Sequence, residues 1–258
     1  MADPKQQAET LFDLHHGSQP LLLPNVWDVA SAQAVAGEGF PVIATSSRAI
    51  AASLGFPDAD VMPADTAFDA VRRIAGDVDL PVTADLEAGY QLPAADFVER
   101  LLQAGAVGCN LEDTDHHGSS MLAPIERQSD RLRAIRRATN DAGVRIVINA
   151  RIDIFLHGSG DPQSHLAEAI ERGKAYLSSG ADCLYPIGLE DTSVIAEFVR
   201  EVDAPVNIWL RPNGPSLEAL AKLGVARVSL ASGLFHVAMK EVQRQLRKLR
   251  AEARDLPA

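Results

Sequence analysis

The chain is poor in cysteine and in long apolar runs. Only Cys109 and Cys183 occur among 258 residues, and both lie inside apolar segments. This usage is typical of reduced core thiols in a cytosolic protein, so no disulfide is expected. No apolar run approaches the roughly 20 residues that cross a bilayer. The N-terminal MADPKQQAET lacks the apolar segment of a secretory signal. We therefore expect a cytoplasmic protein with no membrane partner.

Basic blocks are also absent. The net charge is −11, with 35 acidic and 24 basic side chains, so nucleic acid and anionic membranes are poor candidates as partners. Hydrophobic residues make up 47% of the chain, which is enough for a large core. No linker or change of composition divides the chain, and its length is typical of an α/β barrel. We expect residues 1–258 to form a single domain.

A strand–helix unit recurs along the chain. Short apolar runs alternate with helical patterns, and several runs follow a glycine that suits the end of a helix. The runs are continuously apolar, as in parallel strands buried on both faces. The predicted strands are residues 21–26, 41–46, 80–85, 106–111, 145–150, 182–186, 205–209 and 226–230. Eight such units predict a (β/α)₈ barrel. A doubly wound sheet is the alternative, but no glycine-rich phosphate loop follows the first run.

Four segments lie outside the regular repeat. Residues 5–16 predict an N-terminal helix, and residues 233–255 predict a long C-terminal helix with an extended apolar stripe. That last helix could pack on its own barrel or on a neighbouring subunit. The connections 46–65 and 114–124 are longer than a barrel needs, so we expect them at the active site.

Acidic residues end two neighbouring strands. Asp85 and Glu87 follow the third predicted strand, and Glu112 and Asp113 follow the fourth. The carboxyl ends of parallel strands meet at one barrel mouth, so these acids should cluster. An oxygen-rich cluster suits Mg²⁺, or Mn²⁺, rather than zinc. The alternative is that Asp85 and Glu87 only cap helices.

Further polar residues end the other strands and predict an oxyacid site. They are Asn25, Trp27, Asp28, Thr45, Ser46, Ser47, Asn149, Arg151, Asp153, Asn207, Arg211, Ser229 and Ser232. Arginine can grip a carboxylate in a bidentate fork, and we place Trp27 and Asn207 among the substrate-binding residues. Arg151 could instead pair with barrel acids, and Asn207 could satisfy backbone groups. His116 and His117 lie in a polar loop, where they could be solvated or serve in a lid.

Five motifs resemble the isocitrate lyase / phosphoenolpyruvate mutase superfamily. They are LPNVWDVASA (23–32), TSSRAIAASLGFPD (45–58), TADLEAGY (83–90), NLED (110–113) and NARID (149–153). The resemblance runs from about Leu22 to the last strand. It implies a (β/α)₈ barrel that requires Mg²⁺ and forms tetramers by exchanging a C-terminal helix.

The resemblance also implies roles for individual residues. Asp85 would hold the metal directly, and Glu87 and Glu112 would reach it through water. The backbone N–H groups of Ser46 and Ser47 would grip the substrate carboxylate. Two further active-site groups are implied: the acid Asp58, and Arg151, which would bind an oxyanion or carboxylate.

The loop after the fourth strand departs from the family. Isocitrate and methylisocitrate lyases carry K-[KR]-C-G-H there, whereas this chain has DHHGSS, with neither Cys nor Lys. The gating loop of the mutases and phosphonopyruvate hydrolases, with its Lys and its Asn or Thr, is not matched either. Arg48 stands where the family usually has a small residue. These departures predict a divergent branch in which His116 or His117 replaces the missing proton donor.

The predicted function is a Mg²⁺-dependent lyase. It would cleave a C–C bond in a small 2-oxo or 2-hydroxy carboxylic acid through a metal-stabilised enolate. The alternatives are P–C chemistry on phosphonopyruvate or phosphoenolpyruvate, oxaloacetate decarboxylation, and a catalytically silent barrel that binds an oxyacid. The expected partners are the small oxyacid and further copies of the chain, in a dimer or tetramer.

Overall fold

Nine short parallel strands close into a barrel in the computed structural model, which describes residues 3–118 and 121–254. The strands are β1 Leu21–Leu23, β2 Asn25–Val26, β3 Ile43–Thr45, β4 Val82–Asp85, β5 Gly108–Glu112, β6 Val147–Ile152, β7 Cys183–Pro186, β8 Asn207–Trp209 and β9 Arg227–Ser229. One sheet has the order β2-β3-β4-β5-β6-β7, and the other has the order β1-β9-β8. A parallel bridge between Leu184 and Val206 joins β7 to β8. The predicted (β/α)₈ barrel is confirmed.

The first predicted strand, 21–26, is divided in two. Pro24 lies between β1 and β2 and has no N–H group to donate to a neighbouring strand. β1 pairs with β9, and β2 pairs with β3. The divided strand therefore closes the barrel by joining the two sheets.

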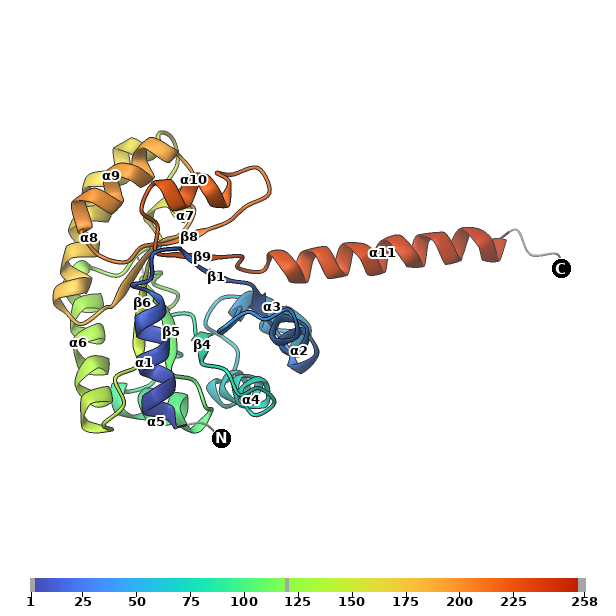
Figure 1. The fold of residues 1–258 in the computed structure, drawn as a ribbon, viewed down its shortest axis with the longest axis horizontal. Coiled ribbons are helices and arrows are strands. Elements are labelled where there is room, and N and C mark those ends of the chain that lie inside the picture. Colours follow the sequence, from blue (N-terminus) through green and yellow to red (C-terminus); the bar gives the residue numbers. More distant parts are fainter. Residues whose placement is uncertain (1–2, 119–120, 255–258) are drawn as a thin grey trace.

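Helices surround the strands (Figure 1). They are α1 Pro4–Leu14, α2 Val29–Gly37, α3 Ser47–Leu54, α4 Ala64–Ala75, α5 Ala94–Gln103, α6 Ile125–Asp141, α7 Ile154–His157, the 3₁₀ helix η1 Pro162–His165, α8 Leu166–Ser178, α9 Thr192–Val202, α10 Leu217–Lys222 and α11 Gly233–Arg254. The five glycines that the sequence places after helices, Gly39, Gly105, Gly143, Gly180 and Gly224, all have positive φ. Their left-handed backbone explains why glycine punctuates the repeat.

The connection at 46–65 is not a plain loop, because α3 occupies its first half. Ser46 is the residue before the helix, and its hydroxyl accepts a hydrogen bond from the N–H of Ala49 at 3.4 Å. No helix was predicted within this connection. The short alanine-rich helix brings its N-terminus, and with it Ser46 and Ser47, to the barrel mouth.

The last helix contacts the barrel at its first turn and then extends beyond it (Figure 1). α11 projects away from the barrel, and none of its residues is buried (Figure 1). Its exposed apolar side chains include Val242, Leu246 and Leu249. The two cysteines, by contrast, are buried in the core and unpaired. None of the helices within 3–118 and 121–254 combines the length and apolarity that a membrane crossing needs.

Candidate active site

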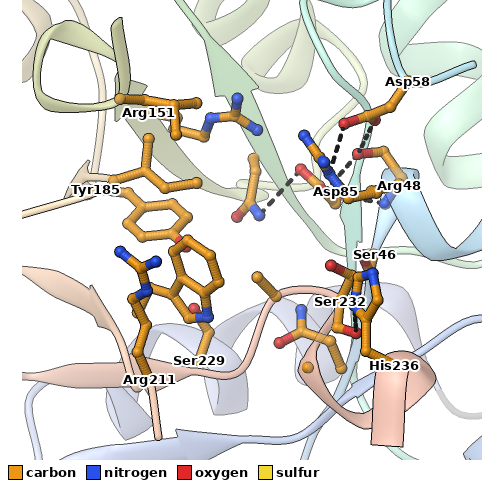
Figure 2. A pocket seen from close by; sticks show the side chains of 18 residues that line it. Ser46, Arg48, Asp58, Asp85, Arg151, Tyr185, Arg211, Ser229, Ser232 and His236 are labelled. Atoms are coloured by element: carbon orange, nitrogen blue, oxygen red, sulfur yellow. Dashed lines mark hydrogen bonds and ion pairs between the residues drawn. The ribbon is translucent and has the colours of Figure 1, made fainter. Parts of the chain in front are cut away.

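Strand register places the predicted acids and the arginine at one end of the barrel. Asp85 lies opposite Asn110 across β4 and β5, and Glu112 lies opposite Arg151 across β5 and β6. Arg151 is in turn opposite Tyr185 of β7. A pocket of about 310 Å³ opens at this mouth (Figure 2). Its polar and aromatic lining comprises Asn25, Ser46, Ser47, Arg48, Asp58, Asp85, Asn110, Arg151, Tyr185, Trp209, Arg211, Ser229, Ser232 and His236.

Asp85 is held by donors on both sides of its carboxylate. Oδ2 accepts hydrogen bonds from the N–H of Ser47 at 3.0 Å and from its hydroxyl at 2.7 Å. Oδ1 accepts one from Nδ2 of Asn110 at 3.2 Å. These three hydrogen bonds fix the orientation of the carboxylate at the pocket wall.

Asp58 lies beside this carboxylate. Its Oδ1 is 3.4 Å from the Ser47 hydroxyl, and its Oδ2 pairs with Nε of Arg48 at 3.0 Å. Burial raises the pKa of Asp58, and the charge of Asp85 adds to that rise, while Arg48 opposes it. The two acids and Arg48 therefore form one charged wall of the pocket.

Ser46 and Ser47 line the pocket, but their backbone N–H groups are already bonded. The N–H of Ser46 donates to the carbonyl of Val26 at 3.0 Å, and the N–H of Ser47 donates to Asp85. Their grip on a substrate carboxylate stays a prediction. What the structure adds is that Ser47 orients Asp85.

Arg151 lines the pocket between two carboxylates. Its Nε and Nη2 each lie 2.7 Å from Asp153, and its Nη1 lies 2.5 Å from Glu112. A guanidinium has five N–H groups, so donors remain for a ligand. Burial raises the pKa of Glu112 to about 7, although Arg151 opposes the rise. Glu112 itself does not line the pocket.

Glu87 lies behind the pocket wall rather than in it. Its Oε2 accepts a short hydrogen bond from the N–H of Asp60, and its Oε1 lies 3.3 Å from the Tyr90 hydroxyl. Burial raises the pKa of Glu87 to about 7. Its backbone is left-handed, with φ of 51°. A non-glycine residue keeps such a strained backbone only where its surroundings hold it. Here the N–H of Glu112 in β5 donates a hydrogen bond to the carbonyl oxygen of Glu87 at 3.1 Å.

The loop histidines contact acids in a separate cavity of about 290 Å³. Nε2 of His116 bonds Glu112 at 2.5 Å, and Nε2 of His117 bonds Asp60 at 3.0 Å. The Glu112 carboxylate raises the pKa of His116. Neither histidine lines the pocket that holds Asp85, and their catalytic role stays a prediction. Residues 119–120, Ser119 and Ser120 of the predicted lid, lie outside the described residues.

Other predicted residues do not line the pocket either, namely Trp27, Asp28, Thr45, Asp113, Asn149, Asp153 and Asn207. Trp27 packs edge-on against Phe235 of α11 at a ring distance of 5.3 Å. Asn207 is fully buried in β8, and neither polar atom of its amide has a partner among the described residues. Asp113 turns away from the mouth and accepts a hydrogen bond from the Tyr176 hydroxyl at 2.7 Å. Asp113 therefore joins α8 to the barrel instead of joining the acid cluster.

Sequence reasoning missed Tyr185, Trp209 and His236 as pocket residues. Tyr185 and Trp209 belong to predicted strands, where an apolar run gives no sign of which residues point inward. His236 lies in the first turn of α11, after the last strand. The position of each at or after a strand's carboxyl end was the available signal.

The donors at the mouth fit Mg²⁺ better than a softer metal. Among the described residues, no three His, Cys, Asp or Glu side chains converge as a ready-made metal cage. Mg²⁺ does not require such a cage, because it keeps several waters and takes one or two carboxylates. Asp85 supplies a carboxylate in the pocket, Asp58 lies beside it, and Glu87 and Glu112 lie behind. This oxygen-only set suits Mg²⁺, and the roles of Asp85, Glu87 and Glu112 as direct and water-mediated ligands stay predictions.

The chain is thus a (β/α)₈ barrel with acidic side chains and arginines in a pocket at its mouth. The family model described as phosphoenolpyruvate phosphomutase matches residues 11–250. The chain belongs to this family, and so is an enzyme of the isocitrate lyase / phosphoenolpyruvate mutase superfamily. Members of the superfamily cleave or rearrange C–C or P–C bonds.

Several relatives cover most of the chain. One solved structure, from Burkholderia cenocepacia J2315, is provisionally named a phosphonomutase and is 36% identical in sequence. The match covers 94% of this chain and 99% of the Burkholderia chain, with a TM-score of 0.88. An uncharacterized protein of Mycobacterium tuberculosis H37Rv is 32% identical over 86% of this chain and 82% of its own length. The 2-methylisocitrate lyase of Bacillus subtilis 168 is 26% identical over 72% of this chain and 61% of its own length.

Proposed function

We propose that the protein is a Mg²⁺-dependent lyase that cleaves a C–C bond in a small 2-oxo or 2-hydroxy carboxylic acid. The observation that carries the proposal is the pocket that joins Asp85 to Arg151. Asp85 is fixed by Ser47 and Asn110 on one side, and Arg151 offers N–H groups on the other. An anionic substrate can therefore lie between a metal anchor and an arginine.

The metal site would consist of Asp85 as direct ligand, with Glu87 and Glu112 in support and Asp58 as a further active-site acid. When bound there, Mg²⁺ would supply Lewis-acid polarisation of the substrate carboxylate and its neighbouring oxygen. The chain's own contribution is to orient the acid and to exclude water. Arg151 would stabilise the negative charge that develops as the C–C bond breaks and an enolate forms.

His236 is the imidazole that lies in the pocket itself. Its Nδ1 is 2.7 Å from the carbonyl oxygen of Ser232, which can only accept a hydrogen bond, so Nδ1 carries the proton. Nε2 is then left with its lone pair when the ring is neutral. We propose that Nε2 accepts a proton from the substrate and then returns it to the enolate, which makes His236 an alternative to the predicted donors His116 and His117.

P–C bond chemistry is the second candidate function. The description of the matching family and the name of the B. cenocepacia structure both point to it. It would use the same acids and Arg151, with a phosphonate in place of the cleaved carbon group.

The test is a substrate panel of 2-oxo acids (including oxaloacetate), 2-hydroxy diacids and phosphonopyruvate. Release of pyruvate and phosphate is measured with and without EDTA, and with Asp85→Asn as the matched isosteric variant. The proposal expects C–C cleavage that EDTA and Asp85→Asn both abolish. Phosphate release identifies the second function instead. Turnover that is unaffected by EDTA contradicts the metal site.

Two further proposals concern the assembly and location of the protein. The exposed apolar side chains of α11 support a homo-oligomer, a dimer or a tetramer, in which this helix covers a neighbouring subunit. The two free buried cysteines support a cytoplasmic location.

A further inference from the structure

The pocket has a cationic end that the reaction at Asp85 does not use. Figure 2 shows Arg211 and Tyr185 across the pocket from Asp85, Asp58 and Arg48. Arg211 follows β8, and its guanidinium lies over the ring of Trp209 at 4.5 Å. Trp209 is the last residue of β8, so the strand fixes the aromatic ring on which the arginine lies. The ring limits the directions in which the guanidinium can point.

Arg211 is already paired, but only at the surface. Its Nη1 contacts Glu190 in an ion pair whose side chains are 42% and 36% exposed. Exposed pairs of this kind contribute little stability, so a ligand can compete for the guanidinium or share it. Arg151 is different, because buried Glu112 and Asp153 already pair with it and hold part of its guanidinium.

A buried hydroxyl nearby also lacks a partner. Tyr185 lines the pocket and is 3% exposed, and its phenolic oxygen has no hydrogen-bond partner among the described residues. Burial raises the pKa of Tyr185, so the group keeps its proton and remains a donor. A buried hydroxyl without a partner costs free energy that a bound ligand would recover.

We propose that Arg211, Trp209 and Tyr185 form a subsite for a second anionic group, so that the enzyme prefers dicarboxylates to monocarboxylates of the same length. The inference rests on the proposed function, because it takes the pocket as the substrate site. One carboxylate lies at the Asp85 end, and the other lies against Arg211. The pocket volume of about 310 Å³ leaves room for this second group beyond a three-carbon acid. Arg211 is therefore the specificity-determining residue.

The test uses pairs of ligands that differ only in the distal group. Malate is compared with 2-hydroxybutyrate, and 2-hydroxyglutarate with 2-hydroxyvalerate, because in each pair a methyl group replaces the second carboxylate. Binding to the full-length protein with Mg²⁺ is measured by calorimetry. At least one diacid should bind about tenfold or more tightly than its partner, since a hydrogen bond to a charged group contributes about 1.5–3 kcal/mol. Equal binding within both pairs, or no binding of either diacid, overturns the proposal.

Three variants locate the effect. Arg211→Met should make the affinities for the diacid and its monoacid partner about equal. Arg211→Lys should retain part of the preference for the diacid. Glu190→Gln should strengthen diacid binding, because it removes the competing carboxylate. Arg48→Met is the matched control on the opposite wall and should keep the preference. A preference that is lost in Arg48→Met and retained in Arg211→Met contradicts the assignment.

Trp209 offers a direct optical signal. In a Trp27→Phe background Trp209 is the remaining tryptophan, because the chain has two. A diacid that draws Arg211 to itself should change Trp209 fluorescence, and the monoacid of the same length should not. An unchanged signal on diacid binding would place the second carboxylate elsewhere. If diacids bind through Arg211 but no compound is turned over, the proposed lyase function fails while the subsite stands.

Discussion

At the residue scale, one amide links the barrel core to the acid at the mouth. Oδ1 of Asn110 accepts hydrogen bonds from Asn149 at 2.8 Å and from the buried Arg227 at 3.1 Å. Both donors fix the amide so that its Nδ2 faces Asp85. The charge of Arg227 therefore acts on the proposed metal anchor through a single side chain, and it does so without contacting the pocket.

Asn110→Ala should weaken metal binding as well as the fold. It removes a donor from Asp85 and leaves Arg227 without its amide acceptor, which should lower the free energy of unfolding by about 2–3 kcal/mol. Mn²⁺ affinity, measured by electron paramagnetic resonance on the folded variant, should fall about tenfold. The control is Asn140→Ala on the exposed face of α6. Unchanged Mn²⁺ affinity in Asn110→Ala would show that the amide does not position Asp85.

His15 should make stability depend on pH. Burial, reinforced by the charge of Arg227, lowers the pKa of His15 to about 3, and its Nδ1 lies 2.7 Å from the Leu11 carbonyl oxygen. Between its ordinary pKa near 6.5 and about 3, only the unfolded chain binds this proton. The free energy of unfolding should therefore fall as the pH drops through that window, by up to roughly 1.4 kcal/mol per pH unit.

Urea unfolding at pH 7 and pH 5 measures this dependence. His15→Gln should show a smaller loss of stability between the two pH values than the parent protein. His16→Gln, which alters an exposed histidine on the same helix end, should keep the full loss. An identical loss in all three proteins would mean that other groups cause the dependence.

At the scale of elements, α1 packs against the barrel because one strand residue has no side chain. A Cβ on Gly108 of β5 would lie 2.6 Å from Cδ2 of Leu11 and 3.0 Å from Oγ1 of Thr83. Gly108→Ala should therefore displace α1 and destabilise the protein by about 1–3 kcal/mol, measured by thermal unfolding. Gly37→Ala is the control. Its Cβ would meet nothing within 4 Å, so this variant should be neutral or slightly stabilising.

The barrel could be predicted from the sequence because each strand–helix unit has a local pattern that recurs along the chain. The apolar runs and the glycines after helices located every strand, whereas the pairing register came from the structure. The division of the first strand at Pro24 and the helix α3 were not predicted. An apolar run that contains a proline still has the composition of one strand, so the division at Pro24 was not visible. The alanine-rich segment of α3 has no strong helical periodicity, so the helix was not visible either.

The site was predicted less completely than the fold. Asp85, Asp58, Ser46, Ser47 and Arg151 do line one pocket. Glu87 and Glu112 lie behind it, and His116 and His117 line another cavity. Strand order tells which residues reach the mouth, but side-chain direction depends on packing between strands that are distant in sequence. For that reason Tyr185 and Trp209 were predicted only as strand residues, and Asp113 was predicted as part of the acid cluster.

At the scale of the whole molecule, α11 should hold copies of the chain together. The helix projects from the barrel (Figure 1), and Val242, Leu246 and Leu249 are 49%, 59% and 59% exposed. An apolar stripe of this length in water is unfavourable, and burial against a second copy would remove it. Leu246→Asp with Leu249→Asp places two charges in that stripe. The double variant should have a lower molar mass by light scattering, with the barrel's circular dichroism retained. Gln243→Asp, on the same helix, should leave the mass unchanged, whereas a parent protein that is already monomeric would refute this role for α11.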